Sequence, residues 1–293
     1  MKLIAHDAMA RGVLERDTPR WRENYVNESL FYSHRTTEYD KESFPSTLHY
    51  HDYYEILVFV QGDIRYICES EVHTPRYGDI MIVPPGCVHM SMLNAERSQY
   101  ERHVFYLYPD ALDAFGAGVL TSFLSRIPTD TLTVLRAPSR RELLTLLGDL
   151  DAALSADVPE ESVLALSHLI RVFYILNSAT EHEEGGATLL PEHVLSIQRY
   201  MDEHFAEITS VSDVAHHFFY SREYVSRLFK QYFNTSVADY LRTRRVAHSC
   251  KLIAAGVPLS EICFMVGFGN LSTFIRSFRA VTGLTPSSWR AMQ

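Results

Sequence analysis

The sequence predicts an α+β chain of two parts: an amino-terminal β-barrel with a pair of helices, and a carboxy-terminal part made only of helices. Three observations predict this class. Residues 31–108 consist of short runs rich in aromatic and β-branched residues, separated by turn signals, as in all-β sandwiches and barrels. From residue 191 onward, apolar residues recur at helical spacing and one short pattern occurs twice. The length of 293 residues suits two domains.

The composition, with 46% apolar and 22% charged residues, is that of an ordinary globular protein. No stretch approaches the roughly 20 apolar residues of a membrane span, and the first residues lack the apolar core of a signal peptide. The four cysteines form no C-x-x-C pair: Cys68, Cys87, Cys250 and Cys263. We therefore expect reduced thiols, a cytoplasmic location and no membrane partner.

The net charge of −9 is divided unevenly along the chain. Residues 191–293 hold 11 Lys and Arg against 8 Asp and Glu, a net charge of +3, whereas residues 1–190 hold 16 against 28, a net charge of −12. Affinity for nucleic acid depends on the local field of the contacting face rather than on the total charge. Only the helical part is therefore suited to a polyanion.

The amino-terminal part begins with polar residues 1–30, which carry little pattern and which we expect to form a loosely attached arm. From residue 31 the pattern predicts six or seven strands, which include residues 54–60, 64–68, 71–74, 79–83, 89–92 and 101–108. After Pro109 the pattern becomes helical.

Two helices are predicted after the strands. Ser139 caps the first, residues 140–154, whose leucines form one stripe. The second, residues 161–176, is apolar nearly all round and must bury more than one face. A second subunit would cover its outer face and make a homodimer, but the first helix could cover that face within one chain. Residues 181–190 are polar and contain glycine, which predicts a linker between a domain at 1–180 and a domain at 191–293.

The helical domain contains the same helix, turn and helix twice. In the first copy Ser210 and Asp213 form a capping box, and the second helix spans residues 222–230. The second copy begins at Pro258, and its second helix spans residues 271–279 after a cap at Asn270. Equivalent residues of the two second helices are 49 positions apart, which indicates an internal repeat.

One helix, residues 236–255, joins the copies, and Gly256 ends it. A helix of this length reaches about 30 Å, close to the roughly 34 Å of one DNA turn, so it can place two units in adjacent major grooves. Solvated helical hairpins are the plain alternative, but two copies in register favour DNA reading. The candidate DNA-contacting residues are Arg222, Glu223, Ser226, Arg227, Leu271, Ser272, Thr273 and Arg276.

These motifs resemble the AraC-type regulators of bacterial transcription. The resemblance rests on residues 221–230, 240–246, 266–270 and 278–290, and it covers roughly the last hundred residues. It implies that the protein regulates transcription, binds double-stranded DNA and has RNA polymerase as a partner. Ser249 and Cys263 stand where the family usually has alanine. Both are small, so we expect the packing to survive.

A second group of residues lies in the barrel part. His49, His51 and Glu55, followed by a block with Gly86 and His89, resemble the two motifs of the cupin barrel. Residues two apart on a strand share a face, so these side chains can converge inside the barrel mouth. They would bind a small-molecule effector, for which no cofactor is required. Three imidazoles and one carboxylate also suit a divalent transition metal, and a purely structural role is the third possibility.

The expected function is a transcription regulator controlled by an effector, such as a sugar, bound in an acidic cupin-like barrel. The alternative is a metal-dependent cupin enzyme with a helical appendage. Catalysis would need an open metal position and a base, and no separate acid, base or nucleophile constellation stands out. A DNA-binding architectural protein without an effector is a third class, but it leaves the barrel unexplained. The sequence names neither the effector, the DNA site, nor the direction of regulation.

Overall fold

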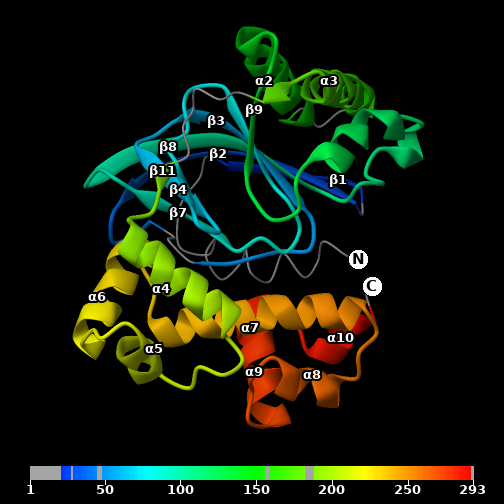
Figure 1. Cartoon of the computed structure of the whole chain (residues 1–293). Helices are drawn as coiled ribbons and strands as arrows, with labels where there is room; N and C mark the ends of the chain where they lie inside the picture. Colours follow the sequence, from blue (N-terminus) through cyan, green and yellow to red (C-terminus); the bar gives the residue numbers. More distant parts are fainter. Residues whose placement is uncertain (1–20, 28, 45–47, 156–158, 182–187, 292–293) are drawn as a thin grey trace.

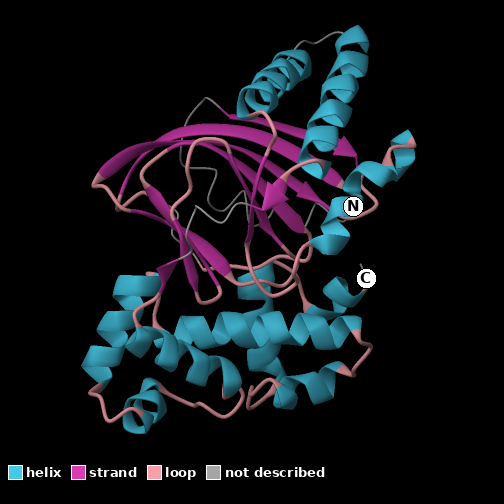
Figure 2. Cartoon of the chain, turned by 45° about the horizontal axis from the view of Figure 1, so that its top comes forward, coloured by secondary structure: helices cyan, strands magenta, loops and turns pink. Residues whose placement is uncertain are grey.

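The computed structural model describes residues 21–27, 29–44, 48–155, 159–181 and 188–291. A barrel of two sheets lies between a pair of helices on one side and a helical domain on the other (Figures 1 and 2). The strands are β1 Trp21–Asn27, β2 Leu30–Asp40, β3 Tyr54–Gln61, β4 Ile64–Cys68, β5 Glu71–His73, β6 Asp79–Val83, β7 His89–Leu93, β8 Arg97–Leu107, β9 Thr133–Arg136, β10 Thr180–Glu181 and β11 Thr188–Leu189. The helices are α2 Arg140–Ser155, α3 Pro159–Asn177, α4 Glu192–Glu203, α5 Val211–His217, α6 Arg222–Phe233, α7 Val237–Ala254, α8 Leu259–Met265, α9 Leu271–Thr282 and α10 Pro286–Arg290, with short 3-10 helices η1 Asp113–Phe115 and η2 Gly118–Arg126.

The larger sheet has the strand order β1-β2-β8-β3-β6-β9-β10, and all of its neighbouring strands are antiparallel. Both of its faces are covered, so alternate residues enter two different cores. On β3, Leu57 and Phe59 point into the barrel, whereas Ile56 and Val58 pack against the helical pair. The same alternation on β8 places Val104 inside the barrel. A strand with both faces buried reads as a nearly continuous apolar run.

The smaller sheet, in the order β11-β5-β4-β7, closes the other side of the barrel. The expected barrel fold is confirmed, but three details of the sequence interpretation were wrong. Residues 21–27 are not an arm, since β1 pairs along β2, while residues 1–20 lie outside the described residues. The chain after Pro109 is not wholly helical, because β9 pairs with β6. Strands β10 and β11 fall in or beside the predicted linker. Strands of two to four residues are too short to show a period.

The helical pair α2 and α3 lies above the larger sheet in Figure 1. The predicted leucine stripe of α2 is buried and shares one core with α3 and with the outer residues of β2, β3, β6 and β8. Phe173 of α3 is completely buried, and its ring lies edge-on to Phe105 at 5.5 Å. Burial of each such side chain contributes roughly 1.5–3 kcal/mol. The inner faces of α3 are therefore covered within one chain.

The carboxy-terminal helices follow the predicted repeat. Side-chain oxygens of Ser221, Ser236 and Asn270 accept the backbone N–H three residues on, and these bonds start α6, α7 and α9. Gly256, just after α7, has φ 81°, the left-handed conformation that ends a helix. Ser249 is completely buried, and its hydroxyl donates to the carbonyl of Val246 at 2.7 Å, so the family's alanine position accepts a serine here.

The helical domain is packed against the smaller sheet through α4 and α7, which lie directly below the barrel in Figure 1. Ile67 and Met90 of the barrel share a core with α4, α6 and the start of α7. Tyr50 and Val88 share a second core with the end of α7, α8 and α9. The two parts of the chain are thus joined by apolar contact as well as by the backbone.

Candidate functional site

The first candidate surface is formed by the two second helices of the repeat, α6 and α9. On α6, Val225, Leu228 and Phe229 are buried, whereas the predicted DNA-contacting residues of this helix are all exposed: Arg222, Glu223, Ser226 and Arg227. The guanidinium of Arg227 lies 5.4 Å from the ring centre of Tyr224, one turn away. The apolar back holds the helix to the domain, and the polar front remains in solvent.

Helix α9 has the same division with different chemistry. Phe274 and Phe278 are completely buried, and the predicted DNA-contacting residues Leu271, Ser272 and Arg276 are exposed, with Thr273 half-buried. The Arg276 guanidinium donates to the Thr273 hydroxyl at 3.4 Å. None of the eight predicted DNA-contacting residues lies in the cores shared with the barrel. Contact with the barrel therefore leaves both candidate reading faces uncovered.

Helix α7 carries the charged contacts between the two parts. Arg244 forms ion pairs with Glu69 of the barrel at 2.6 Å and with Asp202 of α4 at 2.8 Å. The Tyr240 hydroxyl also donates to Asp202 at 3.0 Å. Burial raises the pKa of Asp202 to about 6, and the charge of Arg244 opposes that rise. One arginine of the joining helix thus links the barrel to α4.

The second candidate site lies inside the barrel, where the four predicted residues come together. His49 and His89 face each other in an isolated pair of backbone hydrogen bonds, and their rings lie 4.2 Å apart between centres. Glu55 of β3 lies 3.2 Å from His51 Nε2 and 3.5 Å from His89 Nε2. The Tyr66 hydroxyl donates to Glu55 at 3.3 Å. His51, Glu55 and His89 are buried, and His49 is half-buried.

The hydrogen bonds of the rings fix which nitrogen faces the site. Nδ1 of His51 lies 2.8 Å from the carbonyl of Tyr53, and Nδ1 of His89 lies 3.0 Å from the carbonyl of Cys87. A carbonyl only accepts, so each Nδ1 carries the proton and each Nε2 faces Glu55. Burial raises the pKa of Glu55, but the neighbouring His51 and His89 hold it well below its ordinary value. The site therefore holds an ionised carboxylate.

One buried nitrogen of the site lacks a hydrogen bond. His89 is fully buried, and among the described residues its Nε2 has no hydrogen-bond partner, since the carboxylate at 3.5 Å is too distant. A buried polar atom without a partner costs about 1–3 kcal/mol. Such an atom directed into a polar site indicates that a group which donates to it, or coordinates it, binds there.

Residues of the barrel site alternate with residues that contact α7. Between His49 and His51, the hydroxyl of Tyr50 lies 2.9 Å from Sγ of Cys250 on α7. Beside His89, Val88 packs in the core that contains the end of α7. Adjacent residues of an extended chain point to opposite sides. A movement of the histidines inside the barrel would therefore displace the side chains that hold the helical domain.

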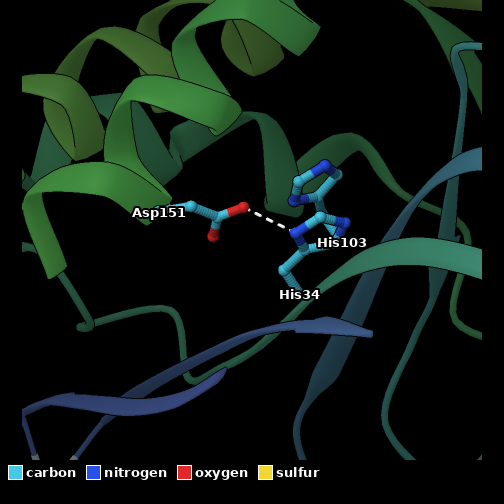
Figure 3. A group of neighbouring side chains, drawn as sticks. All are labelled: His34, His103 and Asp151. Carbon is cyan, nitrogen blue, oxygen red and sulfur yellow. Dashed lines mark ion pairs between the residues drawn. The ribbon is translucent and has the colours of Figure 1, made fainter. Parts of the chain in front are cut away.

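The sequence interpretation missed a third group, His34, His103 and Asp151, which lies on the other face of the larger sheet (Figure 3). Nδ1 of His34 lies 2.6 Å from Asp151, and the two imidazole rings are stacked at 4.1 Å. Burial and the charge of His34 lower the pKa of His103 to about 3. Burial also opposes the charge of His34, but Asp151 and Glu101 raise its pKa above the ordinary value.

No signal in the sequence reveals this third group, because its members are separated by 69 and 48 positions and follow no motif. The cysteines, by contrast, agree with the expectation, since all four are free. Among the described helices, none combines the length and the apolar character that crossing a membrane requires.

A barrel with a buried polar group in its interior, joined to two exposed helix-turn-helix units, defines a regulator with a ligand-binding part and a DNA-binding part. Comparison with known families agrees: residues 33–173 match the AraC-like ligand binding domain, and residues 214–292 match a helix-turn-helix domain. The chain belongs to the AraC family of transcription regulators. It is a regulator and not an enzyme, because its domains and relatives are those of transcription regulators.

Individual relatives are distant. The arabinose operon regulatory protein of Salmonella typhimurium is 25% identical over 221 residues, which are 74% of this chain and 75% of that protein. The regulatory protein SoxS of Escherichia coli is 30% identical over 92 residues, 31% of this chain and 86% of SoxS. Among solved structures, ToxT of Vibrio cholerae with a bound unsaturated fatty acid covers 92% of this chain and 97% of its own, at 13% identity and a TM-score of 0.38.

Proposed function

We propose that the barrel binds a small polyhydroxylated effector such as a sugar, and that this binding changes how the two helix-turn-helix units bind DNA. The observation that carries the proposal is the barrel group itself. Glu55, His51 and His89 converge on one point, and the buried Nε2 of His89 lacks a hydrogen-bond partner among the described residues. Polar groups that converge in the mouth of a barrel are the usual form of a small-molecule site.

The chemistry of the group suits a sugar. A hydroxyl can donate to the Nε2 of His89 and to the carboxylate of Glu55, and it can also accept from Tyr66. Aromatic rings surround these groups, with Tyr53 stacked on His51 at 4.2 Å and Tyr106 edge-on to Tyr53 at 5.2 Å. Rings of this kind can cover the apolar faces of a sugar. One relative is named for the arabinose operon, which favours the same class of effector.

A divalent transition metal is the second candidate for this site, because the residues also fit a metal. Each Nδ1 that donates to a backbone carbonyl leaves Nε2 as a lone pair directed at the site, the arrangement usual for metal-bound histidines. Bound there, a metal would polarise an effector oxygen. In that case His49, Glu55 and His89, whose ligand atoms all lie within 4.8 Å of one another, hold the ion, and His51 stands beside Glu55 at 3.2 Å.

The effect of the effector would reach the DNA-binding part because residues of the barrel site alternate along the chain with residues that contact α7. An effector that moves His49 or His51 moves Tyr50, which contacts Cys250, and one that moves His89 moves Val88. Helix α7 carries both contacts and also joins the two units. We further propose that the exposed faces of α6 and α9 contact bases through the eight residues named above, in the cytoplasm and together with RNA polymerase.

The test uses the full chain and a DNA site selected from random duplexes. A panel of aldopentoses and aldohexoses is screened by thermal shift, and the best ligand is tested for its effect on DNA affinity. We expect Glu55→Gln, which keeps the shape of the side chain, to abolish the response while circular dichroism stays unchanged. Tyr50→Phe should leave effector affinity unchanged and reduce the effect on DNA, since it removes only the hydroxyl that contacts Cys250.

Removal of metal separates the two candidates. If the response survives a chelator and elemental analysis finds no metal, yet Glu55→Gln abolishes it, the residues bind the effector directly. If the response is lost and one metal restores it, the site holds a metal. A response that survives the chelator, Glu55→Gln and His51→Gln alike would refute the barrel site.

We also propose a homodimer through the outer face of α3, where Val163, Leu164 and Tyr174 are exposed by 72, 45 and 64%. Phe173 of the same helix lies in the core of its own chain and does not face a partner. Leu164→Glu with Tyr174→Glu should give monomers at tens of micromolar in sedimentation. Thr145→Glu, at an exposed position of α2, serves as a control for added charge. A monomeric wild-type protein would refute the dimer.

A further inference from the structure

We propose that His34, His103 and Asp151 bind a divalent transition-metal ion at a site separate from the barrel interior. The three side chains come from β2, β8 and α2, and each offers one ligand atom within 4.8 Å of the others. Figure 3 shows the carboxylate of Asp151 directed at the two imidazole rings. Two imidazoles and one carboxylate suit Zn²⁺, Co²⁺, Ni²⁺ or Fe²⁺ rather than Mg²⁺ or Ca²⁺.

Neighbouring groups orient two of the proposed ligands. Nε2 of His34 lies 3.0 Å from the carboxylate of Glu101, which leaves Nδ1 directed at Asp151. The hydroxyl of Tyr32 donates to the other oxygen of Asp151 at 2.7 Å and also lies 2.8 Å from Nδ1 of His103. A carboxylate on the far nitrogen of a ligand histidine, and a hydrogen bond on a ligand carboxylate, are the usual supports of a metal site.

One pair of the proposed ligand atoms, on His34 and Asp151, needs only a small change to admit an ion. The 2.6 Å between His34 Nδ1 and Asp151 Oδ2 is a hydrogen-bond distance, so a proton now lies where the ion would bind. Bonds of about 2.1 Å place neighbouring ligand atoms roughly 3–3.5 Å apart, so these two atoms would separate by less than about 1 Å. A divalent ion that replaces this proton would also balance the negative charges of Asp151 and Glu101.

The proposed site is open to solvent and lies between two elements of the fold. The side chain of His34 is 26% exposed, so an ion can enter from solvent, whereas His103 and Asp151 are buried. Asp151 belongs to α2, and the two histidines belong to neighbouring strands of the larger sheet. The ion would therefore connect the helical pair to the sheet, and it should stabilise the amino-terminal part by mass action.

The experiment uses the untagged full chain in which Glu55→Gln and His49→Gln remove two of the three possible metal ligands of the barrel. After treatment with a chelator, Zn²⁺ binding is measured by equilibrium dialysis, and Co²⁺ is used as a spectroscopic probe. We expect one Zn²⁺ per chain and a rise in the melting temperature. Adding His103→Gln should weaken binding about 100-fold and remove the Co²⁺ absorption band, because one of three protein ligands is lost.

His216→Gln serves as the matched control, since His216 is exposed on α5 and lies outside both groups. It should leave Zn²⁺ affinity unchanged. If His103→Gln fails to fold, Glu101→Gln decides, because it keeps all three ligands and should weaken binding about tenfold. No Zn²⁺ binding by the folded background protein, or affinity that neither His103→Gln nor Glu101→Gln reduces, would overturn the site and leave a structural hydrogen-bond network.

Discussion

The two helix-turn-helix units have the same scaffold and different surfaces. In the first unit the exposed residues of α6 include two arginines and a glutamate, whereas α9 exposes Leu271 and Ile275 by 43 and 37% beside Arg276. Helix α8 of the second unit also exposes Phe264 and Met265 by 67 and 52%. Arginine discriminates bases by paired hydrogen bonds, and apolar side chains contact mainly thymine methyl groups. The first unit is therefore better equipped to select a sequence.

The turns of the two units differ as well. Four residues, 218–221, separate α5 from α6, but five residues, 266–270, separate α8 from α9. Each turn contains one residue in the left-handed conformation, Phe219 with φ 56° and Gly267 with φ 82°. A Cβ on Gly267 would lie 2.3 Å from the carbonyl oxygen of Ala206, whereas the side chain of Phe219 is 96% exposed. The second turn is packed against the chain before α5, and the first turn is open.

The largest expected effect concerns this packed turn. Gly267→Ala should lower the free energy of unfolding of the helical domain by about 2–4 kcal/mol, because it adds left-handed strain and a clash with the backbone of Ala206. Gly256→Ala is the control, since Gly256 has φ 81° and nothing within 4 Å of its added Cβ, and it should cost about 1 kcal/mol. Unfolding is followed by fluorescence of the buried Trp289 in a Trp21→Phe background. Equal losses for the two variants would contradict the close packing.

The two reading helices come next. Arg227→Ala should weaken binding to the selected DNA site by about 2 kcal/mol and relax base preference at one position, whereas Arg276→Ala should cost about 1 kcal/mol. The difference is expected because Arg227 shares its exposed face with a second arginine, Arg222, whereas the exposed residues that precede Arg276 on α9 carry hydroxyl and apolar side chains. Fluorescence anisotropy at fixed salt measures both. A larger loss for Arg276→Ala would reverse the assignment of the two units.

The junction between the units is expected to depend on pH. His248 of α7 stacks on Phe205 at 4.1 Å, and Phe205 packs against the cores of both units. Burial, with the charges of Arg244 and Lys251, lowers the pKa of His248 to about 4 from 6.5. The neutral form is therefore favoured in the fold, and its stabilisation is present above pH 6.5 and is lost as the pH falls toward 4.

Between pH 7 and pH 5 this residue should lower the free energy of unfolding by about 1 kcal/mol, a value reduced for its partial exposure to solvent. Chemical denaturation at the two pH values measures the loss, and His248→Gln should remove that part of it. If the variant and the wild type lose the same stability, the protonation of His248 does not act at the junction.

The smallest effect is expected at the open turn. Phe219→Gly removes the strain of a left-handed non-glycine residue, which is roughly 1 kcal/mol. It also gives the unfolded chain more backbone freedom, which costs about 0.5–1 kcal/mol. The free energy of unfolding should therefore change by less than about 0.5 kcal/mol. Urea unfolding checks this value. A loss above about 1 kcal/mol would mean that Phe219 makes contacts that its exposure does not indicate. Weaker DNA binding at unchanged stability would instead place Phe219 at the DNA.

Much of this protein follows from its sequence alone. The caps at Ser221 and Asn270 and the apolar spacing on α6 and α9 are local signals, because a helix is determined by residues three and four positions apart. The spacing of His49, His51 and Glu55 likewise placed them on one side of the chain, since alternation along an extended segment is also local. Their convergence with His89 was anticipated from the resemblance to the cupin motifs.

Other features were decided only by tertiary structure. Strands β9, β10 and β11 form because each pairs with a neighbouring strand. Two to four residues are too few to show the alternating pattern that would predict a strand. The burial of Phe173 depended on α2 and the sheet covering α3 from two sides. His34, His103 and Asp151 meet because β2 pairs with β8 and α2 crosses above them. Contacts between residues far apart in the chain leave no periodic pattern in the sequence. The sequence therefore determined most helices and strands, and the packing determined which side chains came together.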